Sequence, residues 1–158
     1  MISLLKRFFR SMGYAFKGIK LGIKEERNLR IDMVAMLFVW FHMQFFYFTR
    51  AETAIIVLVT FLIPAFELMN TAVERAVHKP DAEHWMPAGD AKDTAAGAVL
   101  IMTIGVVVIA GIMFFDIHGL SNVLGYYTEN ILHPLGLAMY ITASYFFITI
   151  DNFNKKEK

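Results

Sequence analysis

Long apolar blocks separated by short polar connections run through most of this chain. The blocks cover about residues 31–48, 53–73, 95–115 and 131–150. A helix that crosses a bilayer needs about 20 mostly apolar residues, so each block is a candidate span. The pattern therefore predicts an all-α integral membrane protein, in which three spanning helices are followed by a fourth, C-terminal transmembrane helix.

The N-terminal segment, residues 1–27, has a different pattern. Apolar residues such as Leu5 and Phe8 recur at helical spacing, whereas Lys6 and Arg10 lie on the opposite side. No apolar core followed by a small-residue cleavage site is present, so a signal peptide is not expected. A basic amphipathic helix lies in the lipid headgroup layer, with its cations near anionic lipid. We therefore expect an amphipathic surface helix here.

Lysine and arginine positions predict the orientation. Of fifteen such residues, eight precede residue 31, three lie between the second and third blocks, and three close the chain. The connection 116–130 has none, as the positive-inside rule expects of an external loop. Both termini and the 75–94 segment of this multi-pass chain are therefore expected in the cytoplasm.

Composition agrees with this class. The chain of 158 residues is 57% hydrophobic, 15% aromatic and only 18% charged, which is too apolar for a soluble domain of this length. Cysteine is absent, so disulfides and thiolate chemistry are excluded. A Gly-x-Ser-x-Gly elbow, a His-Glu-x-x-His zinc motif and a Walker loop are also missing.

A polar face interrupts the second apolar block near its end. Glu67, Asn70 and Glu74 stand at i, i+3 and i+7, which lines one side of a helix. A charged side chain near hydrocarbon costs about 2.5 to 3.5 kcal/mol on insertion scales, so such a residue is interpreted as functional by default. The alternative is that Glu67 is a structural carboxyl, protonated and bonded to a neighbouring helix.

Oxygen ligands close to a membrane surface favour magnesium and phosphate chemistry. Mg²⁺ usually shares its oxygen ligands with substrate phosphates. Phosphoryl transfer also needs a cation on the phosphates and a base for the acceptor hydroxyl. These roles could be filled by Glu26, Glu67, Asn70, Glu74, Lys92 and Asp93.

Three motifs resemble, in order and at family spacing, those of the prokaryotic diacylglycerol kinase and undecaprenol kinase family. They read Glu-Arg-Asn-Leu-Arg-Ile over 26–31, Phe-Glu-Leu-Met-Asn-Thr-Ala-Val-Glu over 66–74, and Ala-Lys-Asp-Thr-Ala-Ala-Gly-Ala-Val-Leu over 91–100. The resemblance runs from about residue 7 to residue 115. It implies a small homotrimeric lipid kinase of the bacterial cytoplasmic (inner) membrane that uses ATP and Mg²⁺ at sites shared between subunits. The residues of the three motifs are closer to those of the undecaprenol-phosphorylating branch, so undecaprenol is favoured over diacylglycerol.

The resemblance also implies a role for each matching residue. Glu67 matches the catalytic base, and Glu26 and Glu74 match the metal-binding carboxylates. The nucleotide and phosphate site would be completed by Arg7, Tyr14, Asn70, Lys92 and Asp93. The expected partners are a lipid substrate, the bilayer and further copies of this chain, with no nucleic acid.

Two departures from the family pattern stand out. His78-Lys79 replaces an acidic residue that the family usually has soon after the second metal ligand. The chain also continues past the usual family end. We therefore expect residues 1–115 to form the lipid kinase membrane domain, and residues 116–158 to add an external loop, a peripheral fourth helix and a basic cytoplasmic tail.

Other functions remain open at this point. The acceptor could be diacylglycerol, or Glu67 could relay ions in an ion-coupled transporter. The chain could also be a non-catalytic membrane subunit with structural carboxylates. The grouping of carboxylates, Asn and Lys on one side of the membrane favours the kinase.

Overall fold

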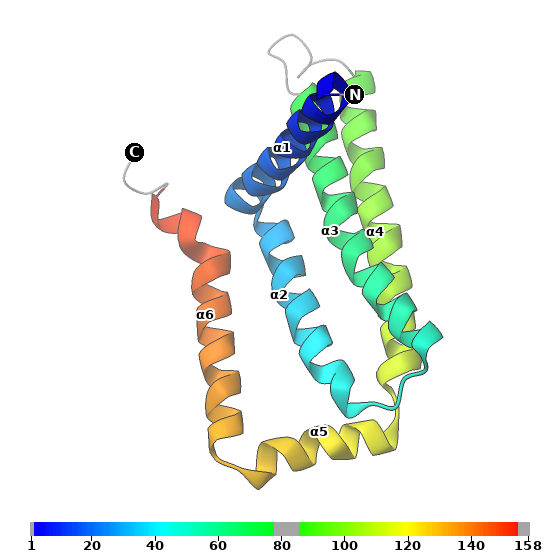
Figure 1. Ribbon diagram of the computed structural model, residues 1–158, viewed down its shortest axis with the longest axis vertical. Helices are drawn as coiled ribbons and strands as arrows, with labels where there is room; N and C mark the ends of the chain where they lie inside the picture. The colour runs from blue at the N-terminus through cyan, green and yellow to red at the C-terminus, as the bar shows by residue number, and fades with distance from the viewer. Residues whose placement is uncertain (1, 78–85, 155–158) are drawn as a thin grey trace.

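The computed structural model describes residues 2–77 and 86–154, which fold into helices joined by short connections (Figure 1). No strand occurs in these ranges, which confirms the all-α prediction. In chain order the elements are α1 (Ile2–Glu25), α2 (Arg27–His42), the 3₁₀ turn η1 (Met43–Phe45), α3 (Arg50–Val77), α4 (Met86–Phe114), α5 (Ile117–Glu129) and α6 (Leu132–Asn154).

Within the described ranges, three helices are long and apolar enough to cross a membrane. They contain Arg50–Val77, Ala88–Phe114 and Leu132–Ile150. The first apolar block of the sequence is different, because α2 has only 16 residues. At 1.5 Å per residue it is about 24 Å long, less than the hydrocarbon thickness of about 30 Å. The four-span topology therefore stays a prediction.

A capping box explains where α3 begins after the α2 turn. The backbone N–H of Thr49 donates to Glu52 Oε2 at 2.7 Å, and the N–H of Glu52 donates to Thr49 Oγ1 at 3.3 Å. This reciprocal pair satisfies two backbone donors at a helix N-terminus. Farther along, Trp40 Nε1 donates to Thr60 Oγ1 at 3.0 Å and ties α2 to α3. The two helices thus form an antiparallel hairpin, and α4 lies along the other side of α3 (Figure 1).

The surface helix α1 crosses the end of this bundle (Figure 1). Gly22 permits the approach, because a Cβ at this position would overlap the side chains of Leu68 on α3 and Leu29 on α2. Apolar residues on α1 stay exposed in the single chain, with Leu4 at 74% and Phe9 at 65%. A membrane surface covers such a face in an interfacial amphipathic helix, as the sequence predicts.

The connection expected as an external loop is largely a helix, α5. Its N-cap is Asp116, whose Oδ2 accepts from the Gly119 N–H at 2.7 Å. Gly119 is required for packing, since a Cβ there would overlap the ring of Phe46. Asn122 Nδ2 donates to the Phe45 carbonyl at 2.9 Å, which joins α5 to η1. The N-cap at Asp116 and the contacts with the end of α2 thus explain why α5 is helical. The absence of Lys and Arg predicted only that this segment is external.

The C-terminal helix α6 packs against α2. The hydroxyl of Tyr140 donates to the carbonyl of Val34. Near the other end of α6, Arg30 Nη2 donates to the carbonyl of Ile148 at 3.2 Å. The C-terminal helix α6 therefore contacts α2 at both of these positions.

Buried polar groups join α2 to α5. His42 is 8% exposed, and its Nε2 lies 2.9 Å from the hydroxyl of Tyr127. Burial raises the pKa of Tyr127, with a further contribution from the neighbouring Tyr126. The phenol therefore stays protonated at neutral pH and donates to the imidazole.

Candidate active site

The polar face of α3 carries Glu67, Asn70 and Glu74. Asn70 Nδ2 donates to Glu74 Oε1 at 3.5 Å, so the amide and the second carboxylate are neighbours. All three side chains are partly exposed. Glu67 and Glu74 are about 10 Å apart along the axis, at 1.5 Å per residue. The face therefore extends from the interior of a candidate span towards the end of its helix.

The corner between α1 and α2 brings a second set of polar groups to this face. The side chain of Asn28 hydrogen-bonds to Glu67, and Glu26 and Glu74 are close enough to Glu67 to interact with it electrostatically. Glu26 is the N-cap residue of α2, yet its side chain makes no capping hydrogen bond. The Glu26 carboxylate is therefore left for other partners.

Arg75 on α3 is one such partner. Its Nη2 lies 3.0 Å from Glu25 Oε2 and 3.6 Å from Glu26 Oε1. The three side chains are between 33% and 50% exposed, so the ion pairs contribute only about 0 to 1 kcal/mol each. A cation held by Glu26 would compete with Arg75 at small cost.

Asp32 on α2 joins the site, although the sequence analysis does not single it out. It lies close enough to Glu67 to interact electrostatically. Its Oδ2 and the Oδ1 of Asn70 are buried and have no hydrogen-bond partner among the described residues. Buried polar atoms are nearly always paired, so these two acceptors without partners mark a place where a donor or a cation would be favourable. The sequence carries one signal for Asp32, which is that a carboxylate stands inside the first apolar block.

The donor set suits a hard cation without forming a complete protein site. In the part of the chain that the structure describes, no three His, Cys, Asp or Glu side chains converge to hold a metal ion by themselves. Mg²⁺ is commonly bound through one or two carboxylates while water and substrate phosphates supply the other ligands. Glu26, Glu74 and the open Asn70 oxygen fit that pattern.

Four of the sequence-predicted residues are not gathered at this face. Lys92 and Asp93 are exposed on α4, whose groove against Asn70 is lined by Ala91 and Thr94 instead. Arg7 and Tyr14 are exposed on α1. Among the described residues, none of these four side chains makes a hydrogen bond or ion pair with the carboxylates around Glu67.

Comparison with known families decides the class of this site. The family model described as prokaryotic diacylglycerol kinase matches residues 13–114, which include the α3 face and the α1–α2 corner. The chain belongs to the prokaryotic diacylglycerol kinase family. The family predicted from three motifs is thereby confirmed, and with it the lipid kinase class.

Individual relatives in this family are moderately similar. The chain is 33% identical over 111 residues to an undecaprenol kinase from Bacillus subtilis, covering 70% of this chain and 89% of the relative. It is 30% identical to a diacylglycerol kinase from Haemophilus influenzae, covering 70% and 95%. A diacylglycerol kinase from Synechocystis is 31% identical, with 64% of this chain matched to 58% of that protein. No solved structure matches the chain significantly.

The family match also separates the two parts of the molecule. It ends at residue 114, where α4 ends, so α5 and α6 lie outside it. The departure at His78-Lys79 lies outside the described residues. The carboxylate face therefore belongs wholly to the family-type helices.

Proposed function

We propose that this chain transfers the γ-phosphate of ATP to the hydroxyl group of a membrane lipid, with Mg²⁺, and that undecaprenol is favoured over diacylglycerol. The observation that carries the proposal is the convergence on Glu67 of Asn28, Glu26 and Glu74 from two helices and the corner before them. One carboxylate lies deep in a candidate span, and the others lie nearer its end. This difference in depth suits a reaction in which a lipid acceptor in the membrane meets a phosphate donor from water.

Glu67 acts as the general base in this reaction. It takes the proton from the lipid hydroxyl as the oxygen attacks the γ-phosphorus. The new lipid O–P bond forms while the bond from the γ-phosphorus to the β–γ bridging oxygen breaks, and ADP leaves with that bridging oxygen. The Asn28 amide holds the Glu67 carboxylate in place. The open oxygen of Asp32 accepts a hydrogen bond from the polar end of the acceptor.

Glu26, Glu74 and Asn70 hold the cation beside the phosphates. When bound, Mg²⁺ offsets the phosphate charge during transfer. The Asn70 amide donates to Glu74 and so orients its carboxylate, while the other amide oxygen stays open. Arg75 balances Glu25 and Glu26 until the cation arrives.

The nucleotide part of the site is shared between copies of the chain in a homotrimer. Lys92 and Asp93 are exposed on α4 within one chain, and Arg7 and Tyr14 are exposed on α1. A neighbouring copy that presents its α4 to this α3 face would bring Lys92 and Asp93 to the phosphates. The sharing that the family resemblance implies accounts for their placement.

The site faces the cytoplasm in this proposal. The start of α1 and the end of α6 lie towards one end of the molecule and α5 lies at the other (Figure 1). Lysines and arginines gather in α1 and in the segment from residue 75 to 94, whereas α5 has none. By the positive-inside rule, the α1 end with Glu26 and Glu74 is cytoplasmic, where ATP is available.

The test is transfer of labelled γ-phosphate from ATP to lipid by the purified chain in bilayers. Undecaprenol and diacylglycerol are supplied in parallel at equal mole fraction. Labelled lipid that depends on Mg²⁺ and forms faster with undecaprenol supports the proposal in full. Faster labelling of diacylglycerol would overturn the acceptor assignment, and ion flux without labelled lipid would overturn the kinase.

A further inference from the structure

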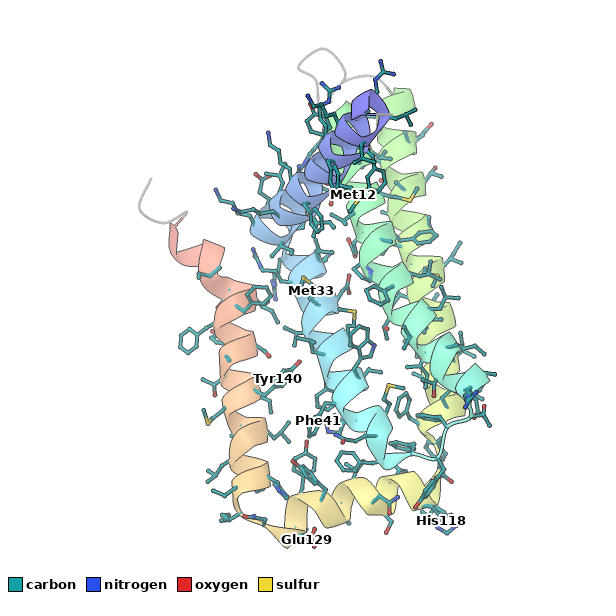
Figure 2. The ribbon with its side chains drawn as sticks, viewed as in Figure 1. Met12, Met33, Phe41, His118, Glu129 and Tyr140 are labelled. Atoms are coloured by element: carbon teal, nitrogen blue, oxygen red, sulfur yellow. The ribbon has the colours of Figure 1, made fainter. Side chains whose placement is uncertain are left out.

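A cavity of about 390 Å³ lies between α2, α5 and α6. Figure 2 shows Phe41 on α2 and Tyr140 on α6 in the space between these helices. Glu67 is beside Asn28 at the opposite end of α2, and α5 and α6 lie outside the family match, so this cavity is separate from the kinase site. Its walls include Leu37, Phe41, His42, Tyr126, Leu137 and Tyr140.

Most polar atoms in the cavity wall are hydrogen-bonded to other protein groups. His42 Nδ1 lies 2.8 Å from the carbonyl of Phe38, which can only accept, so the proton is on Nδ1 and Nε2 accepts from Tyr127. His133 Nδ1 likewise donates to the Tyr126 carbonyl at 2.6 Å, and the two rings stack at 3.8 Å. Both ring nitrogens of His42 and one ring nitrogen of His133 therefore have partners.

One acceptor in the lining stays open. The second ring nitrogen of His133 has no hydrogen-bond partner within the residues that the structure describes, and His133 lines the cavity. No Asp, Glu, Lys or Arg is among the lining residues. The cavity therefore offers a hydroxyl one acceptor but gives a phosphate or an amine no opposite charge.

The helix beside the cavity indicates which kind of ligand can enter it. α6 is a candidate span whose outward side chains are apolar, with Met139 at 74% exposure. The cavity lies beside the first turns of this span, within reach of the lipid that surrounds α6. Lipid tails are as apolar as leucine, so a chain is selected there by packing and hydrogen bonding and not by the hydrophobic effect.

We propose that this cavity holds the hydrocarbon chain of an uncharged, hydroxyl-bearing membrane lipid, whose hydroxyl donates to His133. The aromatic wall packs along the chain, and the absence of ionised groups excludes charged headgroups. This site is distinct from the acceptor position at Glu67 and does not require ATP.

The test is photolabelling of the full chain in bilayers without nucleotide. One probe is a diacylglycerol with a diazirine in its acyl chain, and the control is a phosphatidylglycerol with the same chain. Adducts of the neutral probe are expected in residues 37–41 and 132–140, about threefold above the charged probe, which corresponds to about 0.6 kcal/mol. Unlabelled diacylglycerol should compete. Equal labelling by both probes, or even labelling along all spanning helices, would show ordinary boundary lipid and overturn the proposal.

A pair of glycine variants sharpens the test. Gly136 lines the cavity and has no atom within 4 Å of an added Cβ, so Gly136→Leu fills the space without a clash at its first carbon. Gly125 on α5 is equally open but does not line the cavity, which makes Gly125→Leu the matched control. Labelling of 37–41 should fall in the first variant only. Unchanged labelling in Gly136→Leu, or copy-to-copy crosslinks through 37–41, would overturn the lipid assignment.

Discussion

The α1–α4 part and the α5–α6 part of this molecule differ in what their polar groups do. Around Glu67, carboxylates of like charge gather, and Asp32 and Asn70 keep buried oxygens without described partners. At α5 and α6, most hydroxyls and imidazole nitrogens have hydrogen-bond partners, as in the bond between His42 and Tyr127. Like charges held close together destabilise a fold, whereas hydrogen-bonded neutral groups stabilise contacts. The difference supports the proposal that catalysis occurs in the first part and that the second part contributes mainly packing.

The largest expected effect comes from Glu67→Gln. The change keeps the size of the side chain and its bond to Asn28, but it removes the base. Turnover should fall by about 100-fold or more, the usual contribution of a general base, while assembly and MgATP binding persist. Lipid phosphorylation is measured beside Glu52→Gln, a carboxylate change at the other end of α3. Near-normal turnover in Glu67→Gln would remove this residue from the mechanism.

Loss of a metal ligand should act through Mg²⁺. Glu26→Gln and Glu74→Gln each remove a hard oxygen ligand, so the Mg²⁺ concentration for half-maximal activity should rise about tenfold or activity should vanish. Glu25→Gln is the matched control, because Glu25 also pairs with Arg75 but is not among the residues that interact with Glu67. Unchanged Mg²⁺ titrations in both variants would make Glu26 and Glu74 surface charges.

Sharing of the site between copies predicts that two inactive variants recover part of the activity when they are mixed. Glu67→Gln and Lys92→Ala should each be inactive alone. Mixed before assembly, they should regain part of the wild-type rate, because some sites then combine an intact Glu67 with an intact Lys92 from a neighbour. Activity is measured against the mixing ratio. No recovery at any ratio, in mixtures shown to co-assemble, would place both residues in the same subunit's site.

Helical spacing explains why much of the active face was predictable from the sequence. Glu67, Asn70 and Glu74 share a side of any helix, and three motifs brought Glu26 to the same site. Lys92 and Asp93 remain predicted site residues, because spacing within a chain does not describe how copies assemble. Asp32 was missed because it stands alone in an apolar block.

The second part of the fold was harder to predict. The order in α5 depends on an N-cap at Asp116 and on close contact of Gly119 with Phe46, which are tertiary features. The early end of α2 at His42 was hidden by the aromatic residues that follow, since they continue the apolar block. Hydropathy cannot separate a helix from an apolar turn.

The smallest effect is expected on stability alone. Tyr127→Phe removes the hydroxyl that bonds buried His42 and leaves Nε2 without a described partner, which costs about 1 to 3 kcal/mol. The midpoint of thermal unfolding in detergent should fall by a few degrees, with the catalytic rate unchanged. Tyr145→Phe is the control, since Tyr145 is 63% exposed and its hydroxyl makes no hydrogen bond with described residues. Equal midpoints in the two variants would show that the α2–α5 bond contributes nothing.

The most direct test of the account is phosphate transfer by a chain that ends near Phe115. Helices α1 to α4 hold every proposed catalytic group, so this shortened chain should still label lipid in a bilayer. Its thermal stability should be reduced, because Arg30, Val34 and His42 lose their hydrogen bonds to α5 and α6. Helical content and oligomeric state are measured on the same sample. A shortened chain that folds and assembles like the full chain, yet phosphorylates neither undecaprenol nor diacylglycerol, would contradict the assignment of catalysis to α1–α4.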